Sequence, residues 1–456
     1  MGLNFMQTAI VILAAGKGTR MKSEMPKVLH EVAGAPLLVH CMKTAQTIDP
    51  EHLIIVAGHG SEDVTKTART YAPDSQIVTQ SAQLGTAHAV AQSREILSGF
   101  EGDLIILYGD TPFIRPETLG KLAQARQKSD LVVLGFQAND PGRYGRLVTS
   151  GTDLLEIVEY KEANAAQKDI TLCNSGVLAG PAQLIFQLIE QVETSNNAGE
   201  LYLTDCIALA RAAGKSAGVV TCPEAETLGV NSRRDLAQAE QVFQNNARAA
   251  LMDTGVSLLA PETVFLSFDT VIGRDALIEQ NVVFGAGVTV ETGAKIRAFS
   301  HLEGCHVSRE AVIGPYARLR PGAEVANAAK IGNFVEIKNA QIGEGAKVNH
   351  LSYIGDADIG SDSNIGAGTI TCNYDGVMKH HTQIGQNVFI GSNTMLVAPV
   401  DIGDGAMTAS GAVITKNVPE DALALARAEQ INKPGLARKL RKLLAKRKQQ
   451  NETGKS

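Results

Sequence analysis

The chain has 456 residues, more than a single hydrophobic core usually supports, so two domains are expected. Its formal charge of -6 argues against a general nucleic-acid-binding protein, because such proteins need a basic surface to meet phosphates. The six cysteines are dispersed, without a CxxC pair or a His/Cys cluster at metal spacing, which argues against a disulfide framework and a zinc site.

The N-terminal stretch carries no sign of export or membrane insertion. It lacks a cationic start and a small-residue cleavage site, and its apolar run at residues 8–15 is too short to cross a bilayer. We therefore expect a cytoplasmic protein with neither a membrane nor a nucleic acid as its partner.

Short β-branched runs alternate with longer helical patterns from residue 8 to about residue 230. The runs lie at residues 9–13, 53–58, 103–110 and 131–136. This alternation predicts a doubly wound, Rossmann-like α/β sheet. We assign this domain to residues 1–231 and expect a polar, alanine-rich linker helix at residues 232–252.

A glycine-rich segment, LAAGKGTRMKSEMPK, directly follows the first predicted strand and covers residues 13–27. Gly16 and Gly18 allow backbone amides to approach a nucleotide phosphate, and Arg20 and Lys27 add positive charge. A methionine stands where a dinucleotide-binding fingerprint needs its third glycine, and the P-loop pattern is absent, so neither a Rossmann dehydrogenase nor a P-loop enzyme is supported.

Asp110 ends the strand-like run DLIILYGD, at the sheet edge where this fold class binds its ligands. An aspartate at the end of a strand is also a common cap or turn former. The residue by itself therefore leaves a structural and a functional interpretation open.

Large apolar residues recur every sixth position from about residue 264 onward. The first set is Ile272, Ile278, Phe284, Val290, Ile296 and Leu302. Glycine often follows the aliphatic residue, and the pattern breaks between about residues 371 and 383. Such hexapeptide repeats are typical of a left-handed parallel β-helix, which we assign to residues 253–456. The alternative is a scaffold without chemistry, which the polar residues around the break oppose.

Polar residues suited to acyl transfer to an amine gather near this break. Such a reaction needs a base, donors for an oxyanion and contacts to both substrates. His350 lies two residues after the inward-facing Val348, and in a stack of coils we expect it near Glu336, which would favour the imidazolium form. Cys372 offers an acyl-enzyme alternative, but no base stands beside it.

Two strings carry a family resemblance. The segment at residues 13–27 closely resembles the signature of sugar nucleotide pyrophosphorylases. NIGAGTITCNYDG, at residues 364–376, resembles the bifunctional bacterial N-acetylglucosamine-1-phosphate uridylyltransferases and glucosamine-1-phosphate acetyltransferases, and the match is nearly continuous from about residue 8 to residue 430. The resemblance implies an N-terminal domain of the nucleotide-diphospho-sugar transferase type.

The resemblance implies that the N-terminal half joins UTP to N-acetylglucosamine 1-phosphate. Arg20 and Lys27 would counter charge on the pyrophosphate, while Asp110 and Asn231 would hold Mg²⁺. The implied nucleotide contacts are Leu13, Ala14, Ala15, Gly16, Gly18, Lys27, Gln80, Gln83, Gly85, Thr86, Tyr108, Gly109 and Asp110. The implied sugar-phosphate contacts are Gly145, Glu159, Asn174, Tyr202, Thr204 and Asn231. Gly145 also suits a turn, and Asn174 a strand cap.

The resemblance implies that the C-terminal half acetylates glucosamine 1-phosphate with acetyl-CoA. His350 would be the general base and Glu336 would orient it, while Asn373 and the backbone of Tyr374 position amine and thioester. The implied sugar-phosphate contacts are Arg320, Lys338, Tyr353, Asn364 and Lys379. The implied acetyl-CoA contacts are Ala367, Asn373, Tyr374, Ser392, Ser410 and Arg427. Ser410 departs from the alanine that the family often has. Family members are homotrimers, so a homotrimer is expected.

Two rival interpretations remain open. One is a pyrophosphorylase whose β-helix is structural or regulatory, and the other is a solenoid interaction protein with a degenerate nucleotide domain. The basic tail at residues 431–456 is either a solvated helix face or a surface that attracts the phosphates of CoA.

Overall fold

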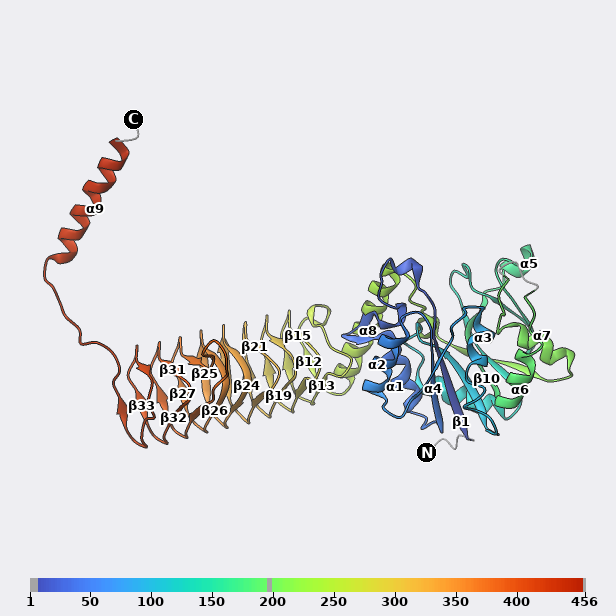
Figure 1. Ribbon diagram of the computed structural model, residues 1–456, viewed down its shortest axis with the longest axis horizontal. Coiled ribbons are helices and arrows are strands. Elements are labelled where there is room, and N and C mark those ends of the chain that lie inside the picture. The colour runs from blue at the N-terminus through green and yellow to red at the C-terminus, as the bar shows by residue number, and fades with distance from the viewer. Residues whose placement is uncertain (1–6, 195–198, 454–456) are drawn as a thin grey trace. The chain divides into compact units, whose positions relative to one another are not determined.

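The computed structural model describes residues 7–194 and 199–453, and the chain forms two compact units (Figure 1). The first unit ends at Asp253 and also takes in Phe265–Thr270. The second comprises Thr254–Val264 and the chain from Val271 onward. The chain therefore enters the second unit, returns briefly to the first, and then continues.

The first unit is built on a nine-stranded mixed sheet with the order β5-β4-β1-β6-β10-β7-β11-β9-β8. Its strands are β1 (Thr8–Ala14), β4 (His52–Ala57), β5 (Gln76–Thr79), β6 (Asp103–Tyr108), β7 (Leu131–Gln137), β8 (Arg146–Ser150), β9 (Asp153–Val158), β10 (Leu172–Pro181) and β11 (Ala217–Cys222). β1 pairs in parallel with β4 and β6, whereas β10 runs antiparallel to β6 and β7. The predicted α/β sheet is confirmed, with each apolar run forming a strand.

Helices cover both faces of this sheet (Figure 1). They are α1 (Leu37–Gln46), α2 (Ser61–Tyr71), α3 (Thr86–Ala91), α4 (Pro116–Arg126), α5 (Ala165–Lys168), α6 (Ala182–Ile189) and α7 (Asp205–Ala212), with 3₁₀ turns η1 (Thr19–Met21), η2 (Lys27–Leu29) and η3 (Glu224–Thr227) and the small ladder β2 (Glu31–Val32) and β3 (Ala35–Pro36). Alternate residues of β1 enter different apolar clusters, as the two-residue period of a strand requires. The sheet is thus buried on both faces.

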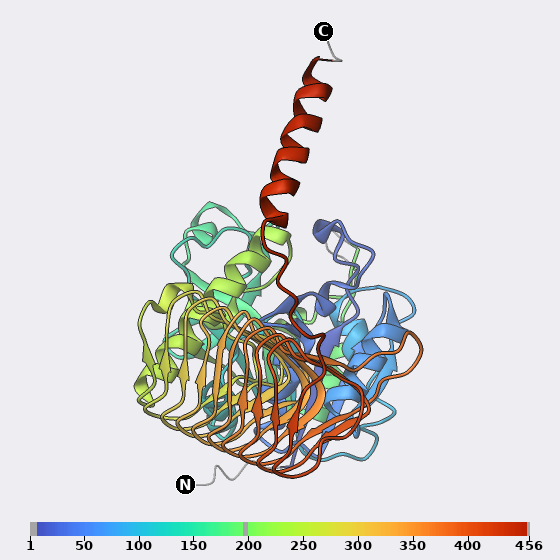
Figure 2. The same ribbon diagram turned by 90° about the vertical axis from the view of Figure 1, so that its left-hand side faces the viewer.

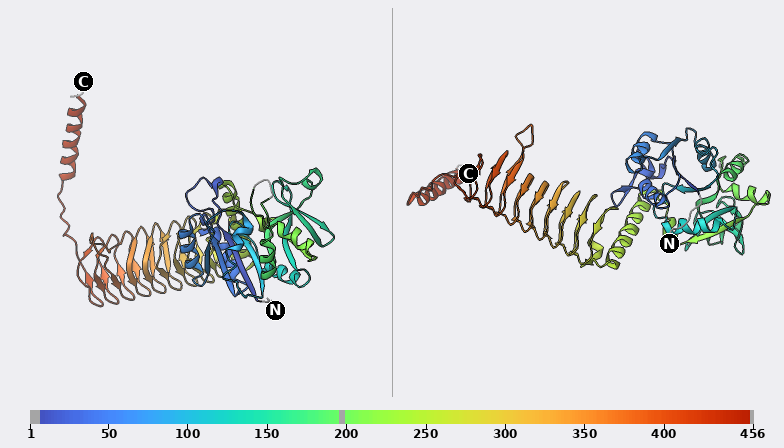
Figure 3. Two further views of the ribbon diagram at one scale, coloured as in Figure 1. Left: turned by 45° about the vertical axis from the view of Figure 1, so that its right-hand side comes forward. Right: turned by 90° about the horizontal axis from the view of Figure 1, so that it is seen from below.

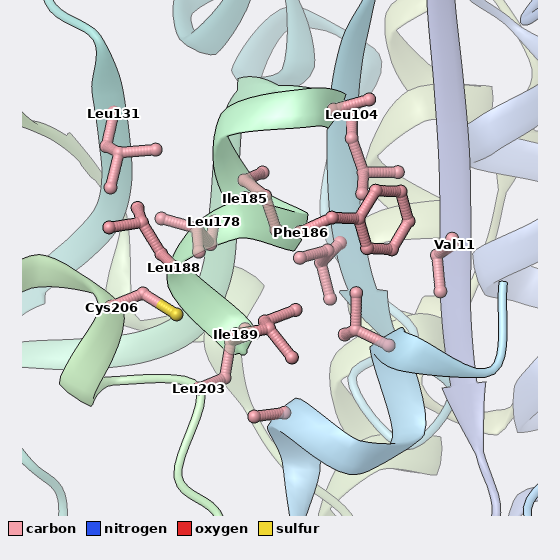
Figure 4. Close-up of a cluster of buried hydrophobic side chains, with 14 of the residues drawn as sticks. Val11, Leu104, Leu131, Leu178, Ile185, Phe186, Leu188, Ile189, Leu203 and Cys206 are labelled. Atoms are coloured by element: carbon pink, nitrogen blue, oxygen red, sulfur yellow. The ribbon is translucent and has the colours of Figure 1, made fainter. Parts of the chain in front are cut away.

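One of these clusters packs α6 against the sheet, with Ile185 and Phe186 facing Leu178 and Leu104 (Figure 4). Ile185 is fully buried. We expect Ile185→Ala to destabilise the first unit by about 2–5 kcal/mol, because it removes buried carbons and leaves a cavity. Urea unfolding followed by circular dichroism at the helix band measures this loss. Leu155→Ala, at an exposed site, is the control, and an equal loss in both variants would contradict the expectation.

Helix α8 (Arg233–Asp253) follows the sheet, and the returning segment Phe265–Thr270 packs on it. The buried Gln244 side chain donates to Leu266 O at 2.7 Å and accepts from Leu266 N at 2.9 Å. Phe268 N also donates to Ala33 O at 2.9 Å. A single glutamine therefore satisfies the backbone of the returning segment, as a neighbouring strand would.

The second unit is a stack of coils made of short parallel strands (Figures 2 and 3). Val271 pairs with Thr289, and Ile296 pairs with Ile313 one coil further on. Three hexapeptides therefore make one coil, and each strand pairs with the coils above and below it. The strands form a ten-stranded sheet on one face and a larger branched sheet on the others.

The strands of this unit are short, and most have two or three residues. They are β12 (Ser257–Leu258), β13 (Val271–Ile272), β14 (Leu277–Ile278), β15 (Val283–Phe284), β16 (Thr289–Val290), β17 (Lys295–Ile296), β18 (His301–Leu302), β19 (Cys305–Val307), β20 (Val312–Ile313), β21 (Arg318–Leu319), β22 (Ala323–Val325), β23 (Lys330–Asn333), β24 (Glu336–Ile342), β25 (Lys347–His350), β26 (Tyr353–Ile359), β27 (Asn364–Ile365), β28 (Ile370–Cys372), β29 (Thr382–Ile384), β30 (Phe389–Ile390), β31 (Met395–Val397), β32 (Val400–Ile402), β33 (Met407–Thr408), β34 (Val413–Ile414) and β35 (Leu423–Ala424), with one 3₁₀ turn, η4 (Pro261–Thr263). The apolar residues at every sixth position, from Ile272 to Leu302, are all buried, which confirms the repeat.

The break in the repeat is a loop between β28 and β29. An antiparallel bridge joins Tyr374 to Lys379, and His380 N donates to Asn373 O at 2.8 Å. Asp375 Oδ1 accepts from the backbone N–H of Val377 at 2.8 Å. The loop is therefore closed by its own hydrogen bonds and extends out from the coils.

The chain ends in helix α9 (Leu436–Thr453), which the basic tail forms. Its cations and its leucines at residues 436, 440, 443 and 444 are exposed. Among the residues that the structure describes, every helix is too short or too polar to span a bilayer.

Candidate active sites

A cavity of about 330 Å³ opens at the carboxyl ends of β1 and β6. Parallel strands of this fold class bind ligands at this edge. Its lining residues are Leu13, Ala15, Gly16, Lys27, Gln80, Gln83, Gly85, Thr86, Ala89, Tyr108, Asp110 and Glu200. The structure thus gathers most of the predicted nucleotide contacts around one space. Ala14 and Gly109 are chain neighbours of lining residues, and Gly18 lies against the lining residue Lys27, but none of the three lines the cavity itself.

The glycines after β1 have separate physical roles. A Cβ added at Gly16 would meet no atom within 4 Å, so the backbone there is open to a ligand. Gly18 has φ +59°, and a Cβ there would lie 2.6 Å from Lys27 Cβ. Glycine at position 18 therefore lets Lys27 pack against the loop.

Two glutamines line the cavity and donate hydrogen bonds to backbone oxygens beside it. Gln83 Nε2 donates to Ala15 O at 2.6 Å, and the buried Gln80 donates to Gly85 O at 3.1 Å. Thr86 Oγ1 accepts from Leu203 N at 2.9 Å. The turn that carries Gly85 and Thr86 is therefore fixed at both ends.

Four predicted residues form a charged cluster at this cavity. The ammonium group of Lys27 pairs with Asp110 and donates to Asn231 Oδ1 at 3.1 Å, while Arg20 donates to the same oxygen at 2.8 Å. Val230 N donates to Asp110 O at 2.9 Å and joins the two loops. The structure thus brings Asp110 and Asn231, which lie far apart in the sequence, to the same ammonium group of Lys27.

The donor set fits a divalent cation that keeps most of its ligands from phosphates and water. Asp110 and Asn231 supply only oxygens, which Mg²⁺ prefers. No group of three or more His, Cys, Asp or Glu side chains able to hold a metal ion occurs among residues 7–194 and 199–453. A cation bound to both oxygens would take them from Lys27.

The predicted sugar-phosphate residues lie on the other side of Tyr108. Asn174 N donates to Gly145 O at 2.8 Å, and Thr204 Oγ1 donates to Glu159 Oε1 at 3.4 Å. Tyr108, Asn174 and Thr204 line a second, smaller cavity. Tyr108 therefore lines both cavities. Tyr202 lies two residues before Thr204, whereas Asn231 lies away from this group, with Asp110.

Burial raises the pKa of Glu159, and the hydrogen bond from Thr204 opposes this only in part. The folded chain then binds the proton more tightly than the unfolded chain, so stability falls as pH rises from the usual glutamate range through the raised pKa. We expect Glu159→Gln to raise the melting temperature on the order of 2 °C at about pH 8 and to change it little at about pH 4. The exposed Glu156→Gln is the control, and a loss of stability at the higher pH would contradict the expectation.

In the second unit, predicted residues stack on successive coils. The ladder pairs Glu336 with Tyr353 and Lys338 with Gly355. Nearby Lys338 lowers the pKa of Lys379, so two ammonium groups lie close together. Such a pair is a receptor for an anion. Asn364 lies on a different sheet, paired with Lys347.

His350 is oriented by a residue that the sequence did not indicate. Its Nδ1 lies 2.8 Å from Asn333 Oδ1, and the two residues are register partners in β25 and β23. Glu336 instead accepts from Arg320 Nη1 at 2.8 Å. Within one chain, His350 therefore contacts Asn333 while Glu336 contacts Arg320, and β24, which carries Glu336, belongs to a different sheet from β25.

The predicted acetyl-CoA residues Ala367, Ser392 and Ser410 occupy matching places on successive coils. Ala367 O accepts from Asn393 N at 2.7 Å, and Ser392 O accepts from Gly411 N at 2.8 Å. Arg427 Nη1 donates to Ser410 O at 3.0 Å. Because this contact uses the backbone, serine in place of alanine at position 410 does not interrupt it.

Sequence reasoning missed three side chains at these sites: Glu200, Asn333 and Asp356. Glu200 lies two residues before the predicted contact Tyr202, and the sequence carries no separate signal for it. Asp356 is a carboxylate at a position that the structure buries, and its place next to Gly355 in a repeat was the one available signal.

Comparison with known proteins identifies the family. A family model described as a MobA-like NTP transferase domain matches residues 10–174, and one described as bacterial transferase hexapeptide (six repeats) matches residues 381–416. Three similar chains are named bifunctional protein GlmU. They come from Ruegeria pomeroyi (64% identical, 98% of this chain and 100% of the relative), Ruegeria sp. (62%, 97% and 99%) and Roseobacter denitrificans (60%, 98% and 100%).

The chain belongs to the GlmU family. GlmU membership makes it a bifunctional transferase, with a nucleotidyltransferase domain and a hexapeptide domain of the acyltransferase type. The hexapeptide match and the stacked parallel strands together confirm the predicted left-handed parallel β-helix. For a GlmU chain, a divalent metal requirement at the first site and association through the repeat region are implied.

Proposed function

We propose that the chain makes UDP-N-acetylglucosamine in two steps. The C-terminal unit acetylates glucosamine 1-phosphate with acetyl-CoA, and the N-terminal unit then joins N-acetylglucosamine 1-phosphate to UTP and releases pyrophosphate. The observation that carries the proposal is the cluster of Lys27, Asp110 and Asn231 at the cavity of the first unit, in a chain that also stacks His350 and Lys338 on neighbouring coils of the second.

In the uridylyl step, a phosphate oxygen of the sugar attacks the α-phosphorus of UTP in line, and the bond to pyrophosphate breaks. No protein nucleophile is required. Lys27 and Arg20 face the charge that develops on the leaving group, and the open backbone at Gly16 approaches the phosphates. Mg²⁺ held by Asp110 and Asn231 supplies further neutralisation of phosphate charge when bound.

In the acetyl step, the sugar amine forms a bond to the thioester carbon and the carbon–sulfur bond breaks. One proton leaves the amine for His350 and ends on the CoA sulfur. Because Asn333 Oδ1 accepts from His350 Nδ1, the Nε2 lone pair remains for that proton. Lys338 and Lys379 receive the phosphate group of the sugar.

A homotrimer is part of the proposal. Phe299, Tyr316 and Phe334 stack along one corner of the β-helix, with ring centroids 4.9 and 5.3 Å apart, and each ring is about half exposed. Such a contiguous apolar strip marks an interface. Light scattering on the purified chain tests it, and a monomer with full acetyl transfer would overturn it.

One coupled assay separates the candidate functions. The full chain is incubated with glucosamine 1-phosphate, acetyl-CoA, UTP and Mg²⁺, and UDP-N-acetylglucosamine and free CoA thiol are both measured. We expect both products. A pyrophosphorylase with a merely structural β-helix would release no thiol from this mixture, and would form UDP-N-acetylglucosamine only after N-acetylglucosamine 1-phosphate is added. An interaction protein would form neither product.

A further inference from the structure

Asp356 is a buried carboxylate that joins several coils at the acetyl site. It lies in β26, is only 8% exposed and has φ +49°. Its Oδ1 accepts from Asn339 Nδ2 at 2.7 Å, and its Oδ2 accepts from Asn373 Nδ2. Lys338 Nζ lies 3.8 Å from the same Oδ2. Its partners come from the coils on both sides of β26, and none of the preceding steps gives Asp356 a role.

The carboxyl group of Asp356 is ionised at neutral pH. Burial by itself would raise its pKa, but the two amide donors and the charges of Lys338 and Lys379 outweigh burial and lower it. An ionised carboxylate only accepts hydrogen bonds. Both asparagine side chains must therefore turn their NH₂ groups toward Asp356 and their oxygens away from it.

This leaves Asn373 with a defined chemical face. Its backbone N–H donates to Thr371 O at 2.9 Å, its backbone oxygen accepts from His380 N at 2.8 Å, and its NH₂ group donates to Asp356. Oδ1 is the remaining polar atom, and it is an acceptor. An attacking amine keeps its lone pair for the carbonyl carbon, so an acceptor that holds one of its N–H groups aligns that lone pair.

We propose that Asp356 is a positioning residue for acetyl transfer: it locks the Asn373 side chain so that Oδ1 accepts an N–H of the sugar amine. The inference rests on the proposed acetyl transfer. It names the group that orients Asn373 and predicts which face of that amide meets the substrate.

The first test removes the lock. Asp356→Ala is expected to lower kcat for acetyl transfer by about 10-fold to 100-fold while the KM for acetyl-CoA stays within about twofold. Uridylyl transfer by the same preparation reports the amount of folded first unit and is expected to be unchanged. Asp401→Ala, which removes another carboxylate paired with an asparagine, Asn417, is the matched control and keeps the wild-type kcat.

The second test exchanges the partners, so that it does not depend on a cavity. Asn373→Asp alone places two carboxylates against each other and is expected to lose acetyl transfer. Adding Asp356→Asn restores a donor at 356 and an acceptor at 373. We expect the double variant to have a kcat for acetyl transfer at least about tenfold higher than that of Asn373→Asp alone.

The outcomes are distinct. Wild-type kcat in Asp356→Ala, or a double variant no faster than Asn373→Asp, would overturn the role of Asp356 while wild-type acetyl transfer stands. Absence of acetyl transfer in the wild-type chain would instead overturn the proposed function.

Discussion

Asp110→Asn is expected to lower uridylyl transfer by about 10²-fold to 10³-fold and to leave acetyl transfer unchanged. The substitution keeps the shape of the side chain but removes the charge that pairs with Lys27 and the oxygen charge that would hold Mg²⁺. Pyrophosphate release at saturating UTP measures the first activity, and CoA thiol release by the same preparation measures the second.

The control for this variant is Asp153→Asn, an exposed carboxylate on β9 of the same unit, which should keep both activities. A titration with Mg²⁺ adds a second measurement: we expect Asp110→Asn to need more of the ion for half-maximal rate. Loss of both activities in Asp110→Asn would contradict two independent sites, and full uridylyl transfer would remove Asp110 from the reaction.

His350→Ala is expected to lower kcat for acetyl transfer by about 10²-fold to 10⁴-fold, because it removes the group that takes the amine proton. Uridylyl transfer should be unchanged. Asn333→Ala should give a smaller loss, since it removes the oxygen that orients the imidazole and leaves the base in place. His301→Ala, at an exposed strand position of the same β-helix, is the control.

The pair Asn333 and His350 can be compared with Glu336 in the same assay. If Asn333→Ala lowers kcat and Glu336→Gln does not, Asn333 is the residue that orients His350, as in the single chain. The reverse result would mean that Glu336 reaches His350 only in an assembled oligomer. Wild-type activity in His350→Ala would rule out the proposed base.

Much of the fold follows from local pattern. The apolar runs form β1, β4, β6 and β7, because a continuous run of apolar residues is what a strand buried on both faces requires. The repeat residues from Ile272 to Leu302 face inward, because three hexapeptides close one coil. The return of Phe265–Thr270 to the first unit was not predictable, because it depends on one glutamine, Gln244, at a distant site.

The candidate sites divide in the same way. Lys27 was recognisable as a cation in the glycine-rich segment after the first strand, and Asp110 as the end of a strand, whereas Asn231 was indicated only by the family resemblance. The partner of His350 could not be predicted from the sequence, because the number of residues in a coil varies by one. Val271 pairs with Thr289, whereas Ile296 pairs with the nearer Ile313. Which side chains meet between coils is set by that register and not by sequence spacing.

The ring of Tyr108 has a consequence for how the first site fills. Tyr108 lines both the larger and the smaller cavity. Its ring packs against Gly176, where an added Cβ would lie 2.7 Å from the ring. A ligand that displaced the Tyr108 ring from one cavity would therefore change the room left for a ligand in the other. A larger residue at position 176 would have to displace this ring, so we expect it to change the shape of both cavities.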